Sequence, residues 1–396
     1  MAAKTKRPIH QRDIKGLKYF RDLNPLLDRL HDDAIDRDVA GNPKLHFDQY
    51  TALLLLYFFN PILTSLRGIQ QASTLSKIQH QLGCEQTSLG SLSEAARVFD
   101  PDLLHNIITE LAGQAKPVIP GKEAQALKDL TAVDGTLLPA LPKMAWALWV
   151  DDTHRAAKLH LQFDVLKGVP VCATVTEGNG SETKQLRGTL QPDRFYVIDR
   201  GYAEYQLFQD IVDRSSHFVG RIRNNAVWQV VEERTVSAEA KAAGVLRDRI
   251  VWLGCAQSES VFKQTLRIVE VATGKTDSQG RPEVLLLATD RTDLEAELIA
   301  LAYKYRWAIE LFFRWFKCIL GCKHLLSTSR NGVTIEVYVA LIASLLISVW
   351  TGKKPTKRTF EMLQLYFSGW ASEAELLAHI AKLHQAKKTK PATARP

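Results

Sequence analysis

Residues Arg194–Asp199, with the sequence RFYVID, form a short apolar run that ends in a carboxylate. A run of this kind predicts a strand that is buried on both faces, as in a parallel or mixed sheet. The segment Ala203–Arg214 that follows is amphipathic and predicts a helix, and His217–Ile222 predicts the next strand. A strand, a helix and a second strand in this order predict a sheet that carries helices on its faces.

Three further strands are predicted before this stretch. They cover Leu130–Pro139, Ala156–Val165 and Val169–Thr176, and polar turns at Asp151–Asp152 and Lys167–Gly168 separate them. This spacing is typical of an antiparallel meander. A meander combined with a strand–helix–strand unit predicts a mixed sheet in an α/β domain.

A second strand-rich region extends from about 226 to 289. Its predicted strands and hairpin loop are Val227–Val231, Arg249–Gly254, Gln264–Val271, Gly274–Gly280 and Val284–Thr289. We interpret this region as an all-β insertion into the α/β domain.

Helices are predicted on both sides of the sheet region. The pattern from Tyr19 to Gly113 is helical, and Lys116–Lys122, rich in proline and glycine, marks its boundary. Beyond the insertion, one long helix is expected to begin at Asp293 and to end near Leu320, and a second covers Val333–Trp350. A short amphipathic helix near Glu373–Leu383 closes the chain.

These segments predict three parts. Residues 1–115 are expected to be a helical N-terminal region that binds DNA. Residues 125–350 are expected to be the α/β catalytic domain with its insertion. Residues 351–396 are expected to hold C-terminal helices and a basic tail.

Composition narrows the class of protein. The chain has 396 residues, 46% of them hydrophobic, and 51 Lys plus Arg against 43 Asp plus Glu, a formal charge of +8 that favours a polyanionic partner without proving one. The longest apolar run, Val337–Trp350, is 14 residues, short of the roughly 20 that span a bilayer. The first residues are basic and do not predict a signal peptide. We therefore expect a cytoplasmic protein, associated with the nucleoid, with no membrane segment.

Cysteines and basic clusters leave several interpretations open. The five cysteines have no framework spacing, so no disulfides are expected, and zinc binding by Cys318, Cys322 and His324 is disfavoured because no second ligand pair follows. The basic ends are either solubilising tails or arms that hold phosphate. They comprise Lys4, Lys6, Arg7, Arg12, Lys15 and Lys18 near the start and Lys382, Lys387, Lys388, Lys390 and Arg395 near the end.

Two predicted helices around Gly83 are compatible with a helix-turn-helix or with a plain bundle. In the first case, Arg67, Lys77 and Arg97 would be the DNA contacts. The segment is not strongly basic, so the bundle is favoured at least as well.

A charged stripe runs along the predicted helix after the insertion. Its members, three or four residues apart and therefore on one helical face, are Tyr303, Arg306, Glu310, Arg314 and Lys317. On a helix chosen blindly, such a stripe is the solvent-facing side, with ion pairs between neighbouring turns. Alternatively, it faces a cleft where the carboxylate binds a cation and the basic side chains hold phosphate.

The order Tyr, two residues, Arg, three residues, Glu, six residues, Lys resembles the motif of the insertion-sequence transposases of family four, cut-and-paste enzymes with a D-D-E triad. In that family the first acid stands on the first core strand and the second follows the fourth. Asp134 in Thr131–Thr136 and Asp199 in Val197–Tyr202 match those two motifs. The resemblance spans about Leu130–Trp350 and is weak before it.

The resemblance implies an RNase H-like core in which Asp134, Asp199 and Glu310 are the catalytic residues. They would ligate two Mg²⁺ ions, which Mn²⁺ could replace. The expected partners are double-stranded DNA, as inverted repeats at the element ends and as target, and a second copy of the chain that pairs the ends. The side chains expected to contact DNA are Tyr303, Arg306, Lys317, Arg200 and Arg314.

The resemblance also implies a reaction order: nicking, hairpin formation by the freed 3′-OH, hairpin opening and strand transfer. Better-known relatives stack a flipped base on an aromatic residue shortly before the helix with the third acid. Here only Phe262 lies between Trp252 and Tyr303, so Trp228 and Trp252 are the other candidates.

Other functions remain open from the residues alone. An RNase H-like nuclease would use the same acids without joining ends, and a transposase-derived protein could bind DNA without cutting it. A glycosidase with two carboxylates leaves the basic stripe unexplained. Taken singly, Asp134-Gly135 could be a simple turn, and Asp199 could cap the next helix. His160 and Arg330 are expected to be structural.

Overall fold

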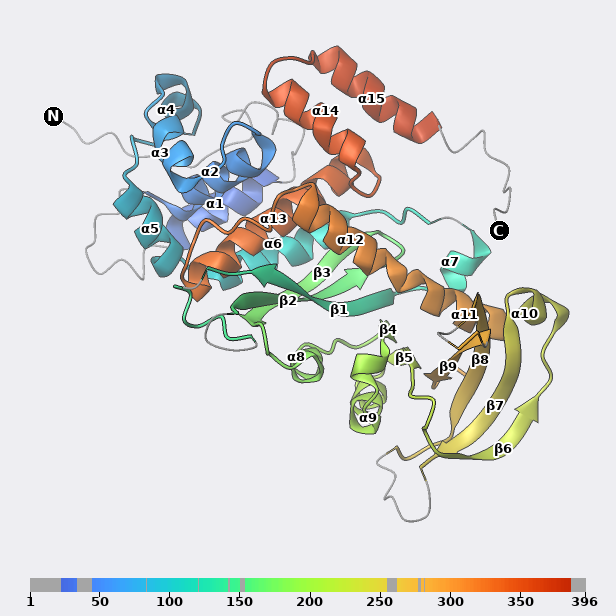
Figure 1. Cartoon of the computed structure of the whole chain (residues 1–396). Helices are drawn as coiled ribbons and strands as arrows, with labels where there is room; N and C mark the ends of the chain where they lie inside the picture. Colours follow the sequence, from blue (N-terminus) through green and yellow to red (C-terminus); the bar gives the residue numbers. More distant parts are fainter. Residues whose placement is uncertain are drawn as a thin grey trace.

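The structure is a computed structural model that describes residues 23–33, 45–82, 84–119, 121–141, 143–149, 154–254, 262–276, 279–280 and 282–385. Within these ranges the strands form one nine-stranded sheet (Figure 1). In spatial order they are β3 (Val169–Glu177), β2 (Ala156–Asp164), β1 (Leu130–Pro139), β4 (Phe195–Ile198), β5 (His217–Arg221), β9 (Pro282–Thr289), β8 (Leu266–Thr276), β7 (Val245–Leu253) and β6 (Trp228–Arg234).

The sheet is mixed, as predicted. β1, β2 and β3 are antiparallel to one another, and β1, β4 and β5 run parallel. The remaining strands pair antiparallel from β5 outward through β9, β8 and β7 to β6. All four residues of β4 are buried because helices cover both sheet faces at this point.

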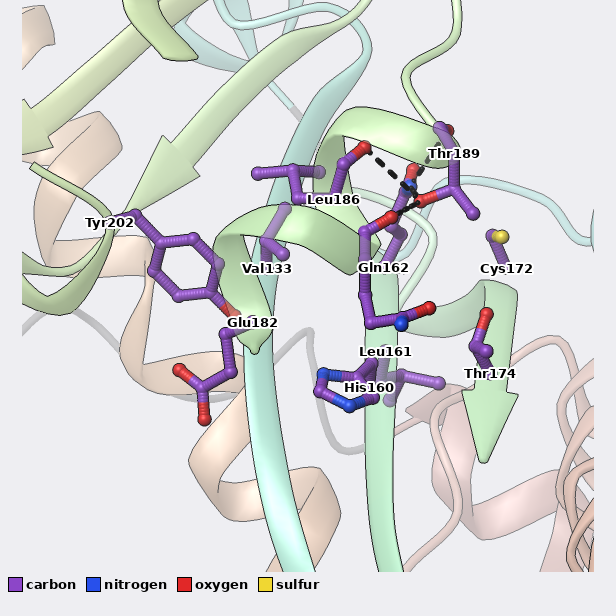
Figure 2. A pocket seen from close by; sticks show the side chains of 11 residues that line it. Val133, His160, Leu161, Gln162, Cys172, Thr174, Glu182, Leu186, Thr189 and Tyr202 are labelled. Carbon is purple, nitrogen blue, oxygen red and sulfur yellow. Dashed lines mark hydrogen bonds between the residues drawn. The ribbon is translucent and has the colours of Figure 1, made fainter. Parts of the chain in front are cut away.

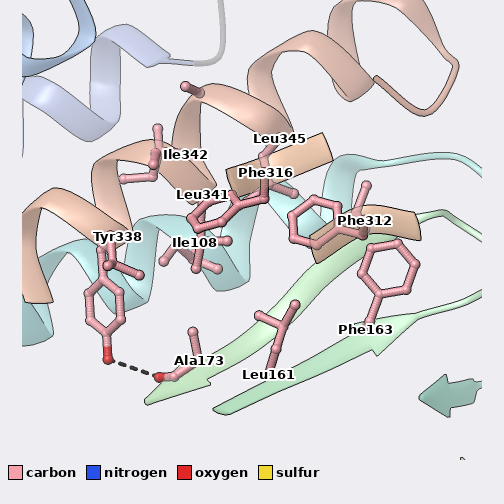
Figure 3. Close-up of a cluster of buried hydrophobic side chains, with 14 of the residues drawn as sticks. Ile108, Leu161, Phe163, Ala173, Phe312, Phe316, Tyr338, Leu341, Ile342 and Leu345 are labelled. Atoms are coloured by element: carbon pink, nitrogen blue, oxygen red, sulfur yellow. Dashed lines mark hydrogen bonds between the residues drawn. The ribbon is translucent and has the colours of Figure 1, made fainter. Parts of the chain in front are cut away.

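One face of the β1–β3 end carries three helices, α6 (Pro101–Gln114), α12 (Trp307–Cys318) and α13 (Arg330–Thr351). Figure 3 shows Phe312, Phe316 and Leu341 from these helices above Leu161 and Phe163 of the sheet. The opposite face of the sheet packs on α8 (Glu182–Gly188), the 3-10 turn η5 (Arg200–Tyr202) and α9 (Tyr205–Asp213).

The predicted helical N-terminal part contains α1 (Asn24–Asp33), α2 (Phe47–Phe59), α3 (Leu66–Ser73), α4 (Ser76–Leu82) and α5 (Leu89–Val98). Arg67, Lys77 and Arg97 are exposed on α3, α4 and α5. One continuous buried cluster runs from these helices through α6 and α13 to the sheet. Apart from Lys382, the basic residues predicted at the two ends lie outside the described residues.

Helix α13 contains the longest apolar run of the chain. Among the described helices it alone is long and apolar enough to cross a membrane, but 89% of its apolar window is buried inside the protein. Because it packs on α6 and β3, its apolar surface forms the centre of the core.

Two predictions of local structure were wrong. The helix expected from Asp293 begins at Ala296 and is divided into α11 (Ala296–Tyr305) and α12. The region expected to be all-β contains a short helix, α10 (Ala238–Ala242), which Ser237 caps. The short helices α7 (Lys122–Ala126) and α8 and the turn η5 were not predicted, and the C-terminal part contains α14 (Lys357–Phe367) before the final helix, α15 (Glu373–Gln385).

Candidate active site

Strand β1 carries the first predicted acid, Asp134. Side chains alternate along the strand, so Asp134 lies on the α12 side while Val133 lies among the residues that pack on α8 and α9. Its Oδ1 accepts a hydrogen bond from the Gly135 N–H at 2.8 Å. Because β1 continues to Pro139, the interpretation of Asp134-Gly135 as a simple turn is wrong.

The second acid, Asp199, follows β4 directly. β4 is parallel to β1, with Ala132 opposite Val197. Asp134 lies two residues after Ala132 on β1, and Asp199 lies two residues after Val197, just beyond the end of β4. The parallel register therefore brings the two acids to neighbouring positions of the sheet.

Asp199 caps the 3-10 turn η5, whereas the helix that it was considered as a cap for, α9, has Glu204 as its N-cap residue. The Oδ1 of Asp199 accepts a hydrogen bond from the Arg200 N–H at 2.6 Å. The Tyr303 hydroxyl donates to the same oxygen at 3.2 Å. Asp199 thus has a local role in the turn and a contact with the predicted motif helix.

The helix that carries the motif residues Tyr303, Arg306, Glu310 and Lys317 is tightened into a 3-10 turn around Arg306. The Arg306 N–H donates to the Tyr303 carbonyl at 3.0 Å, and the Ile309 N–H donates to the Arg306 carbonyl at 3.2 Å. These bonds span three residues, as in a 3-10 turn, and separate α11 from α12. Despite the break, the side chains of Tyr303, Arg306 and Glu310 remain on the side that faces the two aspartates.

Arg306 is the cation among the predicted acids. Its NH1 nitrogen lies 3.4 Å from Asp134 Oδ2 and 3.4 Å from Glu310 Oε1. The side chains of Arg306 and Asp134 are 13% and 18% exposed, whereas that of Glu310 is 38% exposed. The third acid therefore stands at the open side of the cluster.

Lys317, the last motif residue, reaches back to the first motif strand. Its Nζ donates to the Thr136 hydroxyl at 2.9 Å. Thr136 follows Asp134 by two residues and so lies on the same face of β1. No role was predicted for Thr136, because its contact depends on Lys317, which is remote in sequence.

Two other predicted DNA contacts stand apart from this cluster. Arg200 and Arg314 are both exposed, and neither side chain has a described hydrogen bond or ion pair with the three acids. Their positions leave the guanidinium groups open to solvent.

Burial and a neighbouring like charge raise the pKa of Asp134, the first of the three predicted acids. Burial, followed by the charge of Glu310, raises the pKa of Asp134 to about 7, against the lowering effects of the Gly135 N–H and Arg306. Burial, followed by the charge of Asp199, raises the pKa of Tyr303 to about 12, so its hydroxyl keeps the proton that it donates. The cluster therefore holds more negative charge than its one guanidinium offsets.

The acids suit a hard divalent cation in chemistry, because carboxylate oxygens are the donors such ions prefer. The repulsion that raises the pKa of Asp134 is also what such a cation would offset. However, within the described residues no group of three His, Cys, Asp or Glu side chains is arranged to hold a metal ion. Arg306 lies where the acids converge, so it would have to release them for a shared ion.

The three aromatic side chains predicted as candidates for base stacking differ in exposure. Phe262 is 2% exposed and packs edge-on against Phe218, so it cannot receive a base. Trp228 is half-buried with the Arg249 guanidinium 5.9 Å from its ring centre. Trp252 is 45% exposed and is the most accessible of these three side chains.

The chain matches a known family and several known proteins. Residues 125–346 match the model described as "Transposase DDE domain". A putative transposase of Sinorhizobium fredii is 29% identical over 58% of the chain and 62% of its own length. A probable transposase for an insertion sequence element of Geobacillus stearothermophilus is 26% identical over 61% of the chain and 63% of its own length. The chain thus aligns with less than two thirds of either relative.

A longer alignment links the chain to a putative transposase for an insertion sequence element of Synechocystis, 22% identical over 76% of the chain and 83% of that protein. Among solved structures, a piggyBac transposase synaptic complex with hairpin DNA has a TM-score of 0.42 and 11% identity over 94% of the chain and 86% of its own. At this TM-score the likeness does not establish a shared fold.

The matched family region contains Asp134, Asp199 and Glu310 together with the whole motif helix. It also contains every strand of the sheet. Because the family model covers more than half of the 396 residues, the chain belongs to the transposase DDE domain family.

Proposed function

We propose that the chain is a DNA transposase that cuts at the ends of a mobile element and joins those ends to target DNA. One observation carries the proposal: Asp134 and Glu310 share the Arg306 guanidinium at 3.4 Å, inside the residues that match the DDE family. Asp199 lies beside Asp134 through the register of β1 and β4 and is the third acid of the proposed triad.

Within this proposal, Asp134, Asp199 and Glu310 hold divalent cations, with Mg²⁺ as the ion and Mn²⁺ as a substitute. Bound there, such ions would activate the attacking oxygen and stabilise the leaving oxygen of the phosphodiester. The donor chemistry and the like-charge repulsion at Asp134 support this assignment.

The basic and hydroxyl residues position the substrate and the acids. Arg306 would leave the acids for a DNA phosphate, a planar bidentate partner that suits a guanidinium. Lys317 would hold a second phosphate as a point charge from its place beside Thr136. The Tyr303 hydroxyl would keep Asp199 oriented because it keeps its proton at neutral pH.

The mixed strand order, with Asp134 on β1 and Asp199 just after β4, supports an RNase H-like core with an insertion between β5 and α11. A second copy of the chain would pair the two DNA ends. Action on genomic DNA implies a place in the cytoplasm at the nucleoid, and Arg200 and Arg314 would contact the duplex outside the acid cluster.

A specific observation favours a second candidate function, a DNA-binding protein that does not cut. The acids contact the Arg306 guanidinium, and among the described side chains no three-residue metal cluster is formed. A permanently retained Arg306 would block cation binding and leave a protein that holds phosphate only.

The two functions are separated by incubating the full chain with a labelled duplex that carries the element end, with and without Mg²⁺. The transposase proposal predicts Mg²⁺-dependent nicking followed by joined products. Binding without any cleavage in Mg²⁺ or Mn²⁺ would favour the DNA-binding protein. Cleavage without joined products would favour a nuclease.

A further inference from the structure

A cavity of about 720 Å³ lies beside helices α11 and α12. Residues 118–119, which precede α7, and residues 354–355, which follow α13, form further walls, and Phe163 near the end of β2 adds another side chain. Sites for small organic molecules have volumes of roughly 300–1,000 Å³. The cavity therefore has room for a small organic ligand.

A second cavity, behind β1, differs from the first in size. Figure 2 shows His160, Gln162 and Tyr202 around it, and its volume is about 10 Å³. A volume of this size holds about one water molecule. The cavity behind β1 is therefore too small for an organic ligand, whereas the cavity beside α12 is not.

Aromatic side chains form the inner wall of the cavity beside α12. Phe163 of β2 packs against Phe312 of α12 with ring centres 5.1 Å apart, and Figure 3 shows the two rings next to each other. Trp315, about one turn further along α12, packs against Phe312 with ring centres 6.2 Å apart. All three side chains line the cavity and are buried, so its inner wall is apolar.

Two large apolar side chains of α12 are exposed at the same cavity. Trp307 is 60% exposed and Leu311 is 48% exposed, and both belong to the lining. They are four residues apart and therefore lie on one face of the helix. An apolar ligand that covered them would be stabilised, because it would remove their surface from water.

The charged side chains of the described lining are all positive. Lys304 of α11 and Lys354 after α13 are exposed, and neither forms an ion pair with another described residue. One acid acts on the lining from outside it, since burial and then the charge of Glu123 raise the pKa of Tyr305. Two lysines against one carboxylate leave an excess of positive charge at the opening of the cavity.

We propose that this cavity binds an amphipathic organic carboxylate, with its apolar body against the aromatic wall and its acid group paired with Lys304 and Lys354. An uncharged apolar ligand would leave both ammonium groups without a partner. A wholly polar anion would leave the aromatic wall uncovered. A carboxylate on a hydrocarbon or aromatic body matches both features of the site.

Other occupants match the cavity less well. The C-terminal stretch of the chain is basic in sequence, with Lys387, Lys388 and Lys390, so its charge has the same sign as that of the opening. Double-stranded DNA would match the two lysines, but it presents phosphates at its surface and does not match an aromatic wall. The combination of wall and charge therefore favours a small amphipathic anion.

The site adjoins the helix that carries the third acid of the proposed triad. Trp307 directly follows Arg306, and Leu311 directly follows Glu310. A ligand that covers Trp307 and Leu311 would thus contact α12 on the face next to the acid cluster. The proposal itself does not depend on transposition, because it rests on the shape, apolar wall and charge of the cavity.

Titration calorimetry of the full chain with dodecanoate tests the proposal. We expect saturable binding of one dodecanoate per chain, and decanoate, which is two methylene groups shorter, should bind about tenfold more weakly. Lys304→Gln combined with Lys354→Gln should weaken dodecanoate binding by about fivefold, because it removes both opposite charges. Lys184→Gln combined with Lys241→Gln, at exposed lysines of α8 and α10, is the matched control and should keep wild-type affinity.

A filled cavity provides a second test. Ala308→Phe places a ring in the lining and should abolish dodecanoate binding, whereas Ala242→Phe, at an exposed position of α10, should not change it. Melting temperatures show whether each variant is folded, and the lysine variant remains decisive if Ala308→Phe unfolds.

Three results would overturn the proposal. The first is the absence of saturable dodecanoate binding by wild type. The second is equal affinity of wild type and the lysine variant. The third is a single-stranded oligonucleotide that displaces dodecanoate from wild type but not from the lysine variant, because the occupant would then be nucleic acid.

Discussion

Two arginine–carboxylate clusters of the molecule hold their charges differently. Arg267 of β8 pairs with Asp248 of β7 through two bonds, of 2.9 and 2.8 Å, and the side chains are 2% and 4% exposed. Arg306 instead reaches Asp134 and Glu310 through one nitrogen, at 3.4 Å each. The first pair has the bidentate geometry of a strong ion pair, and the second does not.

This difference in geometry indicates a structural role for the Arg267–Asp248 pair and supports the functional role proposed for the Arg306 cluster. Arg267 also donates to the carbonyls of Arg291 and Leu294, so its donors are used within the fold. Arg306 has donors to spare beside partly exposed acids. We infer that the Arg267–Asp248 pair fixes the structure, whereas the Arg306 cluster is built to exchange partners.

The largest expected effect comes from the same substitution at the two arginines. Arg267→Met leaves the buried Asp248 without a partner and should lower the free energy of unfolding by about 3–5 kcal/mol. Arg306→Met should lower it by less than about 1 kcal/mol, since its acids are partly hydrated. Denaturant unfolding measures both. Equal losses would remove the distinction between the clusters.

A matched double variant sharpens this test. Arg267→Met combined with Asp248→Leu removes both charges of the buried pair, so it should be more stable than Arg267→Met alone. If the double variant is less stable than the single variant, the uncompensated charge is not the cause of the loss.

The next effect concerns metal affinity. Arg306→Gln removes the cation from the acids and should strengthen Mn²⁺ binding by roughly tenfold, because attraction between close opposite charges no longer competes with the ion. Arg306→Lys keeps the charge and is the control, with an affinity near that of wild type. Titration calorimetry measures both, and unchanged or weaker binding by Arg306→Gln would show that Arg306 does not compete with metal.

A third buried carboxylate extends the comparison to pH. Glu336 of α13 is 1% exposed, and its described hydrogen bonds come from the N–H groups of Leu326 and Ser327. Burial raises its pKa to about 8 against the lowering effect of those bonds. The folded state therefore binds more protons than the unfolded state between the two pKa values, so stability should fall as pH rises from about 4.5 to about 8.

Glu336→Gln should flatten this decline, whose slope for one group reaches at most about 1.4 kcal/mol per pH unit. Asp134, with its pKa raised to about 7, contributes a decline of the same sign at lower pH. Because Asp134 still loses its proton between pH 7 and pH 8, Glu336 is isolated by the difference between wild type and Glu336→Gln in that window. Unfolding curves of wild type and variant with the same slope in that window would contradict the prediction.

The smallest effects are expected far from both clusters. Arg67→Ala on α3 and Arg97→Ala on α5 remove exposed side chains and should change the free energy of unfolding by less than about 0.5 kcal/mol. If they contact phosphate, each should reduce the slope of DNA affinity against salt by about 1. Lys241→Ala on α10 is the control. Slopes equal to wild type for both arginine variants would exclude this helical region as a DNA contact.

The strands that carry Asp134 and precede Asp199 were predictable because each contains an apolar run that is typical of a buried strand. Buried runs before Asp199 and around Asp134 mark β4 and β1, and the structure has β4 at Phe195–Ile198 and β1 at Leu130–Pro139. The placement of Tyr303, Arg306 and Glu310 on the side of the helix that faces the two aspartates also follows from helical spacing.

Other features depend on tertiary contacts that no local pattern encodes. No glycine or proline marks the break at Arg306, which coincides with its contacts to two acids. The role of Thr136 depends on Lys317, a residue remote in sequence. The burial of Phe262, predicted as a base-stacking candidate, depends on its packing against Phe218.

The central claim is that the Arg306 cluster serves reaction rather than stability. Its most direct test is Glu310→Gln, with end cleavage in Mg²⁺, duplex binding and melting temperature measured on one preparation. We predict that cleavage falls by at least about 100-fold, while duplex affinity and melting temperature stay at wild-type values. Wild-type cleavage by the variant, or a loss of cleavage accompanied by a large fall in melting temperature, would contradict the claim.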